Sequence, residues 1–130
     1  MAVGLSATNL AAVWLNVLRN TAATAIANTY VKLHTADPGA AGATAAAAGS
    51  TTRVVITYAA PSSGSMAMNG TNPSWTNGGT SETISHISVW DASTAGNFLY
   101  SAALSASQAW ASGNTFTLTS LSIALTPIAA

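Results

Sequence analysis

The sequence has no cysteine and very little charge. Its 130 residues include only three Lys and Arg and three Asp and Glu, so 5% of the chain is charged and the net charge is zero. The missing cysteine excludes a disulfide framework and a zinc–thiolate site. The missing cationic surface excludes electrostatic binding of nucleic acid, which needs several Lys or Arg on one face. No apolar run reaches the about 18 residues of a membrane span, so we expect no membrane partner.

Small neutral residues are abundant instead. Ala (29), Thr (18) and Ser (16) fill 63 positions, and 49% of the chain is apolar, which argues against disorder. The length suits one domain over residues 1–130, made of an N-terminal helix and linker (1–27) and a β-sandwich (28–130). Because few charges keep copies apart, we expect the chain to form a homo-oligomer, specifically a trimer.

An amphipathic helix is predicted near the N-terminus. Apolar residues recur there with the i, i+3, i+4, i+7 spacing that places them on one helical face. Ser6 is a good N-cap, and Asn20 can end the helix. The apolar stripe must pack on the chain's own sheet or on a neighbouring subunit. Its members are therefore candidate interface residues: Leu10, Val13, Trp14, Val17 and Leu18.

After Asn28 the apolar residues alternate, as they do in strands. Because turn residues and no helical patterns separate these segments, we expect a mainly β fold, an antiparallel, jelly-roll-like β-sandwich preceded by the one helix. The last segment changes phase, which predicts a bulge or a switch between sheets near Thr119–Ser120. The expected strands are Thr29–Thr35, Thr52–Ala60, Ser65–Asn69, Glu82–Trp90, Phe98–Leu104 and Thr115–Leu125.

Strict alternation within Glu82–Trp90 divides its side chains between two faces. It predicts Ile84, His86 and Trp90 on one face, with Ile87 and Val89 on the other.

Residues 40–50 form a low-complexity Ala/Gly stretch. Two glycines and no amphipathic face make a poor helix, and the composition offers no core-forming side chain. We interpret the stretch as a loop or arm that is mobile on the free subunit and becomes ordered against a partner.

Few side chains can do acid–base or metal chemistry. Glu82 and His86 are four residues apart on an expected strand, hence about 13 Å apart, too far to share a metal ion. No P-loop, H-E-x-x-H, G-x-S-x-G or G-x-G-x-x-G motif occurs. We therefore expect no enzyme, no catalytic residue, no metal and no cofactor, and we interpret both histidines as hydrogen-bonded imidazoles in a sheet. The candidates weighed are His34, His86, Asp37, Glu82 and Asp91.

Two tryptophans lie in or beside Ser/Asn/Gly loops. Trp75 and Trp110 could expose an indole that stacks on a sugar or fills a pocket of a neighbour. The favoured alternative is that they cap one end of the sandwich core. Both are retained as candidate interface residues.

Three segments resemble a family of small bacteriophage proteins. They are YVKLHTADPGAAG (Tyr30–Gly42), TTRVVITYAAPSSGSM (Thr51–Met66) and SHISVWDASTAGNFLYSAAL (Ser85–Leu104). The composition is also similar to that of proteins from phages of GC-rich actinobacterial hosts. The resemblance implies a virion structural protein without catalytic residues. It also implies that Asp37 and Asp91 begin turns, and that Arg53 pairs with one of these acids.

Two functions of different class follow from the resemblance. The first is a capsid decoration protein, a homo-oligomer that contacts the major capsid protein or other virion proteins. The alternative is a tail fibre or minor tail module that binds a host glycan or receptor. Long fibres usually show heptads or shaft repeats, and neither occurs here, so the sequence favours decoration. Both functions place the protein in the virion.

Overall fold

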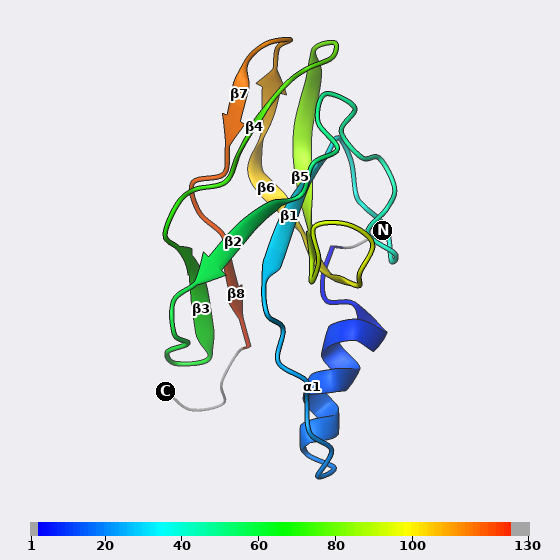
Figure 1. Ribbon diagram of the computed structural model, residues 1–130, viewed down its shortest axis with the longest axis vertical. Helices are drawn as coiled ribbons and strands as arrows, with labels where there is room; N and C mark the ends of the chain where they lie inside the picture. The colour runs from blue at the N-terminus through cyan, green and yellow to red at the C-terminus, as the bar shows by residue number, and fades with distance from the viewer. Residues whose placement is uncertain (1–2, 126–130) are drawn as a thin grey trace.

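A computed structural model describes residues 3–125, which fold into a β-sandwich with a helix projecting from one end (Figure 1). The expected mainly β, antiparallel sandwich with one N-terminal helix is confirmed. The helical part is a π-helical turn, η1 (Ala7–Ala11), continued by α1 (Ala12–Val17). The strands are β1 (Thr29–His34), β2 (Val54–Tyr58), β3 (Ser65–Asn69), β4 (Ser74–Thr76), β5 (Glu82–Trp90), β6 (Phe98–Trp110), β7 (Thr115–Thr117) and β8 (Ser122–Ala124).

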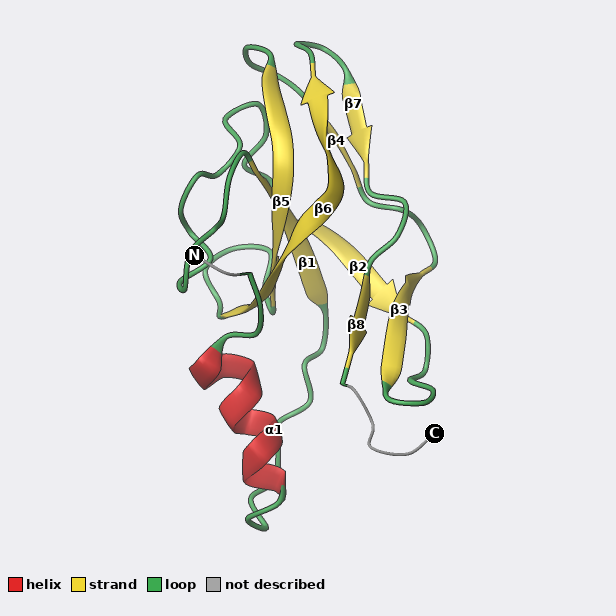
Figure 2. Ribbon diagram, turned by 180° about the vertical axis from the view of Figure 1, so that it is seen from behind, coloured by secondary structure: helices red, strands yellow, loops and turns green. Residues whose placement is uncertain are grey.

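One large curled sheet supplies most of the sandwich. Its strand order is β6-β5-β1-β2-β3-β8, and β4 and β7 form a separate two-stranded ribbon (Figure 2). β1 lies inside the sheet, where it pairs antiparallel with β5 on one side and β2 on the other. The register places His34 opposite His86, so two segments that are distant in the sequence meet at the centre of the fold.

The final segment switches between the two sheets, as its phase change predicted. β7 pairs with β4 in the ribbon, whereas β8 pairs with β3 at the edge of the large sheet. Leu118 and Leu121 lie in the crossing and are both buried. Phe116 therefore lies in β7 and Ile123 in β8, and these two strands contribute to one core.

A large bulge in β6 changes the phase of the core. Ile84 pairs with Gln108 but His86 pairs with Ala103, so four residues of β6 lie opposite Ser85 alone. The core cluster consequently contains Ile84 together with Ile87 and Val89. The expected grouping of Ile84 with His86 and Trp90 is wrong, because a bulge shifts which side chains face inward.

The N-terminal helix keeps only part of its stripe against the domain. Ser6 caps it as expected, since its Oγ accepts a hydrogen bond from the Asn9 amide, and Asn20 (φ +60°) ends it. Leu10 is buried and Trp14 packs partly against the core. The first turn is π-helical, with bonds from residue i to i+5, so later residues are rotated relative to Leu10. Val17 and Leu18 are accordingly exposed.

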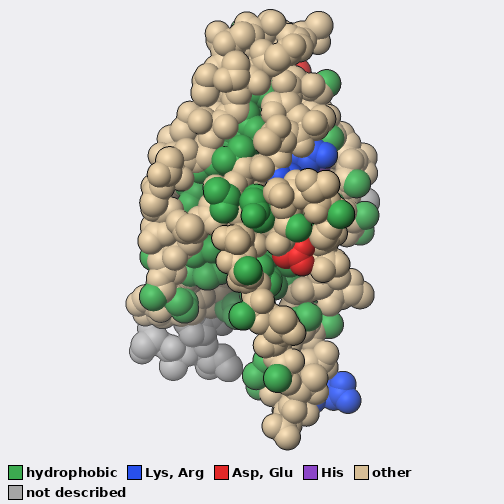
Figure 3. Space-filling view, viewed as in Figure 1, with side chains coloured by type: hydrophobic (Ala, Val, Ile, Leu, Met, Phe, Trp, Pro, Cys, Tyr) green, Lys and Arg blue, Asp and Glu red, His purple; other side chains and the backbone are tan. Residues whose placement is uncertain are grey.

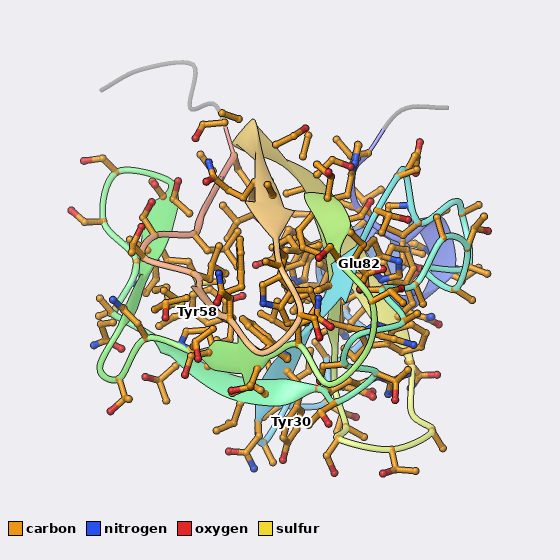
Figure 4. All side chains as sticks on the ribbon, turned by 90° about the horizontal axis from the view of Figure 1, so that it is seen from above. Tyr30, Tyr58 and Glu82 are labelled. Carbon is orange, nitrogen blue, oxygen red and sulfur yellow. The ribbon has the colours of Figure 1, made fainter. Side chains whose placement is uncertain are left out.

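Residues 40–50 are a loop, but not a free arm. Ala47 is completely buried and its amide donates to the Leu33 carbonyl. Glu82, labelled in Figure 4, accepts hydrogen bonds from the amides of Ala48 and Gly49. The expectation that this stretch offers no core-forming side chain is wrong, because alanine and glycine let its backbone lie close to the sheet and Ala47 joins the core.

Candidate interaction surface

His34 lies at the centre of a buried hydrogen-bonded chain. Its Nδ1 is 2.8 Å from the Thr44 carbonyl, which can only accept, so Nδ1 carries the proton. Its Nε2 therefore accepts from the Ser88 hydroxyl at 2.7 Å, and the same oxygen accepts from Trp90 Nε1 at 2.8 Å. Burial is the main cause that lowers the pKa of His34 and keeps the ring neutral. This series of hydrogen bonds links the 40–50 loop to strands β1 and β5.

His86 and Glu82 also have structural partners. The Ser85 hydroxyl donates to the Thr35 carbonyl at 2.8 Å, and His86 Nδ1 lies 2.7 Å from the same Oγ. Both histidines are thus hydrogen-bonded imidazoles in the sheet, as the sequence indicated. Within residues 3–125, no three His, Asp or Glu side chains lie close enough together to hold a metal ion.

Asp37 and Asp91 begin turns, as the resemblance implied. Asp37 Oδ1 accepts from the Gly39 amide at 2.8 Å. Asp91 accepts from both the main-chain and side-chain nitrogens of Asn97, at 2.6 and 2.8 Å. A Cβ on Gly96 would lie 2.4 Å from Asp91 Oδ1, so this turn leaves no room for a side chain there.

Arg53 contacts the second of these turns through the main chain. Its Nη1 donates to the carbonyls of Ala92 and Ala95, at 3.0 and 2.5 Å, and its guanidinium stacks on the Trp90 ring. Asp91 acts on Arg53 through a longer-range Coulombic attraction, which partly offsets the lowering of the Arg53 pKa by burial. Arg53 is thus held at this turn by carbonyl and ring contacts together with the attraction of Asp91, because the closed turn directs its carbonyls towards the guanidinium.

The two loop tryptophans are not exposed. Trp75 and Trp110 keep only 3% and 2% of their surface accessible, and both belong to the core cluster. Each indole nitrogen is satisfied by a main-chain carbonyl, Thr52 for Trp75 and Asn114 for Trp110. The expectation that Trp75 and Trp110 expose their indoles is wrong, and their burial agrees with the alternative in which they pack at the end of the core.

Trp75 and Phe116 face one another across the β4–β7 ribbon, a contact that was not predicted from the sequence. Their ring centroids lie 6.1 Å apart in a tilted arrangement. The alternation in Ser74–Thr76 and Thr115–Thr117, each with one aromatic between two hydroxyl residues, is the signal that could have found this pair.

Four of the eight large apolar side chains that are exposed within residues 3–125 lie at the helical end. Leu15, Val17 and Leu18 are 63%, 54% and 85% exposed, and Ile26 in the following linker is 42% exposed. The face in Figure 3 shows apolar side chains on this projecting end, beside a Lys or Arg side chain, and further apolar side chains across the body of the sandwich. Leu15 and Ile26 belong to this exposed group although the predicted stripe did not include them. Val13, which the stripe did include, is half-buried.

A cavity of about 750 Å³ lies between this helix, its linker and the sheet. Its lining is largely apolar on the helix side, and Tyr58 borders it from β2, with its hydroxyl hydrogen-bonded to that of Tyr100. Burial raises the pKa of both tyrosines, so both hydroxyls stay protonated. Figure 4 labels Tyr58 and, on β1, Tyr30. We call the exposed helix side chains Leu15, Val17 and Leu18, with Ile26 and this cavity, the helical-end surface.

The fold and this surface define a small β-sandwich whose polar motif residues hold its loops and whose projecting helix offers apolar contact area. A family model described as "Podophage GP4 fiber I protein gp80" matches residues 4–126. The chain belongs to this family, and it is a structural protein of the phage virion. The search of curated proteins gives no match. Within residues 3–125 no helix is long and apolar enough to cross a membrane. The link to actinobacterial phages stays a prediction.

Proposed function

We propose that this chain is a building module of a phage tail fibre that acts through protein–protein contacts and carries out no reaction. The family description names a fibre protein, which favours the tail alternative over the capsid decoration role that the sequence favoured. The absence of heptads and shaft repeats still separates this chain from a continuous fibre shaft. It suits a globular module of the fibre.

The observation that carries the proposal is the helical-end surface. Leu18 is 85% exposed on a helix that extends away from the sandwich (Figure 1). Burying apolar area of this kind in a protein contact stabilises it by about 25 cal/mol per Å². Few charges oppose that contact, since the whole chain has three cations and three anions. We take this surface to be the attachment point to another copy or another tail protein.

Glycan binding is not part of the proposal. The argument for it rested on exposed indoles, and both Trp75 and Trp110 lie in the core with their nitrogens satisfied. Recognition of a host receptor would need other groups.

Quantifying copies per virion tests the position of the protein. We expect three to about a dozen copies, with labelled antibody on the tail in electron micrographs. Several hundred copies on the head would contradict the fibre role and restore capsid decoration.

A pair of substitutions tests the surface. The double variant Leu15→Ser/Leu18→Ser should fold normally, because both side chains are exposed, yet should be lost from virions. The matched control is Val55→Ser on β2, where the side chain is 47% exposed and far from the helix in sequence. Incorporation of the double variant at the control level would show that the helical end is not the attachment point.

A further inference from the structure

The far end of the sandwich contains an incomplete sheet. β6 is an edge strand of the large sheet, and among residues 3–125 the strand β7 pairs with β4 alone. Residues 4–6 cover the first part of the β6 edge through bonds at Leu99 and Ser101. From Ala102 to Trp110 the outer edge of β6 has no strand partner among residues 3–125. The main-chain groups that point outward along this part are therefore free of strand pairing, although the carbonyls of Ala106 and Trp110 accept from the side chains of Gln108 and Asn77.

A groove of about 420 Å³ runs between these two unpaired edges. β6 and β7 diverge from the turn at Ser112–Asn114, and Figure 2 shows them side by side. Leu104 and Gln108 line the groove from β6, and Thr115 and Thr117 line it from β7. Ile87 and Leu118 also contribute, so apolar side chains lie among polar walls. An extended chain placed there could pair with an open edge and bury alternate side chains.

The edge lacks the charged residues and prolines that commonly prevent such pairing. No charged residue and no proline occurs between Phe98 and Gly113. Natural edge strands are commonly protected by lysine, proline or coverage by another segment. The bulge near Ser105 bends β6 but leaves this groove accessible.

The opposite end of the molecule carries an unpaired extended segment. Residues 21–28 are all exposed, and none of residues 22–28 makes a main-chain hydrogen bond to a described residue. The segment is uncharged, and alternation would place Thr24 and Ile26 on one face and alanines on the other. Ile26 then supplies the apolar side chain for the groove.

We propose that the β6–β7 groove binds residues 21–28 of a second copy of this chain as an added strand. The linker lies at the helical end, whereas β7 and the end of β6, which line the groove, lie at the far end (Figure 1), so one copy cannot pair its own linker with its own groove. A contact between two different surfaces repeats head to tail, and it closes into a ring or continues as a filament. This inference deepens the proposed fibre role, since it names the partner and the mode of assembly.

Cysteine cross-linking tests the contact directly, because the natural chain has no cysteine. Purified Thr24→Cys and Ala106→Cys proteins are mixed and oxidised. We expect at least a fivefold excess of the mixed disulfide dimer over a control mixture of Thr24→Cys with Ala41→Cys, an exposed loop position. An equal yield from both mixtures would overturn the proposal. A dominant Ala106→Cys homodimer would also overturn it, by showing that β6 edges pair with each other.

A charge introduced at the edge gives a second measurement. Ala106→Lys should raise the dissociation constant of self-association, measured by sedimentation, at least tenfold. Ala41→Lys should change this constant less than twofold. Thermal unfolding confirms that both variants fold. Adding Thr24→Asp to Ala106→Lys should restore association, because opposite charges then face each other across the contact. Failure of this restoration, or a concentration-independent monomer of the natural protein, would contradict the proposal.

These measurements use purified protein only. Finding the protein on the head of the virion would refute the fibre role without changing the cross-linking result. The fibre role and the contact between copies can therefore fail independently.

Discussion

Arg53 places its guanidinium carbon 3.6 Å from the centroid of the Trp90 ring. The cation contacts the aromatic face while Nη1 donates to the carbonyls of Ala92 and Ala95. The side chain thereby joins the residue before β2 to the end of β5 and the turn that follows it. One of the few charges in the chain is thus used to hold a turn.

Arg53→Ala should lower the free energy of unfolding by about 2–3 kcal/mol, because a cation–π contact and two charged hydrogen bonds are lost. Arg53→Lys should recover less than half of this, since an ammonium group cannot stack and reach both carbonyls together. Urea unfolding measures both variants. Arg19→Ala is the control, because Arg19 is exposed and its side chain donates to the nearby Asn16, and it should cost less than about 0.5 kcal/mol.

His34 should make the protein less stable in acid. Burial lowers its pKa in the folded state from the ordinary 6.5, so the unfolded chain takes up the proton first as the pH falls. The stabilisation is complete above about pH 6.5 and is lost as the pH falls towards the folded pKa. Urea unfolding at pH 8, 6.5 and 5 measures the effect.

His34→Gln should flatten this pH dependence, whereas His86→Gln, which keeps His34, should retain it. A dependence unchanged in His34→Gln would assign the effect to another group.

Gly42→Ala should be much more destabilising than Gly113→Ala. Both glycines have positive φ, +68° and +80°, so each substitution carries about 1–2 kcal/mol of backbone strain. At Gly42 the new Cβ would also lie 2.2 Å from the Phe98 ring, while at Gly113 nothing lies within 4 Å. We expect a difference of about 1–3 kcal/mol between the variants. Equal melting temperatures would mean that the loop does not pack on Phe98.

Hydrogen exchange should find residues 47–49 protected on the isolated protein. The Ala47 amide bonds Leu33, and the amides of Ala48 and Gly49 bond the Glu82 carboxylate. Glu82→Ala should speed exchange at Ala48 and Gly49 and leave Ala47 protected, because only the carboxylate bonds are lost. Thr83→Ala, at an exposed neighbouring position, is the control. Rapid exchange at all three amides of the natural protein would support the free arm.

The sequence was a good guide wherever one local pattern decided the structure. The alternation in Glu82–Trp90 matches β5 in both of its bounds, and Asn20 ends the helix as expected. The phase change before Leu121 correctly predicted a change of sheet. Each of these features depends on neighbours along the chain.

Features that depend on contacts between residues far apart in the sequence could not be predicted from it. Ala47 is buried because the backbone around Gly42 and Gly49 fits closely against Phe98 and Asn77, which composition does not reveal. β6 continues to Trp110 although its second half shows no alternation, because β5 and the bulge determine its pairing. The contacts of Arg53 follow from the geometry of the 91–97 turn. Such contacts become visible only when the whole sheet is assembled.

The crossing of the final segment between the two sheets also determines when the fold can be completed during synthesis. Leu118 and Leu121 close the core, and β8 covers β3, yet all leave the ribosome after the other strands. β1 emerges early and must wait for β5. Until the last strand arrives, β3 keeps an open edge and the nascent chain exposes apolar surface that can aggregate. Folding of this module is therefore completed only after β8 has left the ribosome, and premature termination before Leu118 should yield an insoluble product.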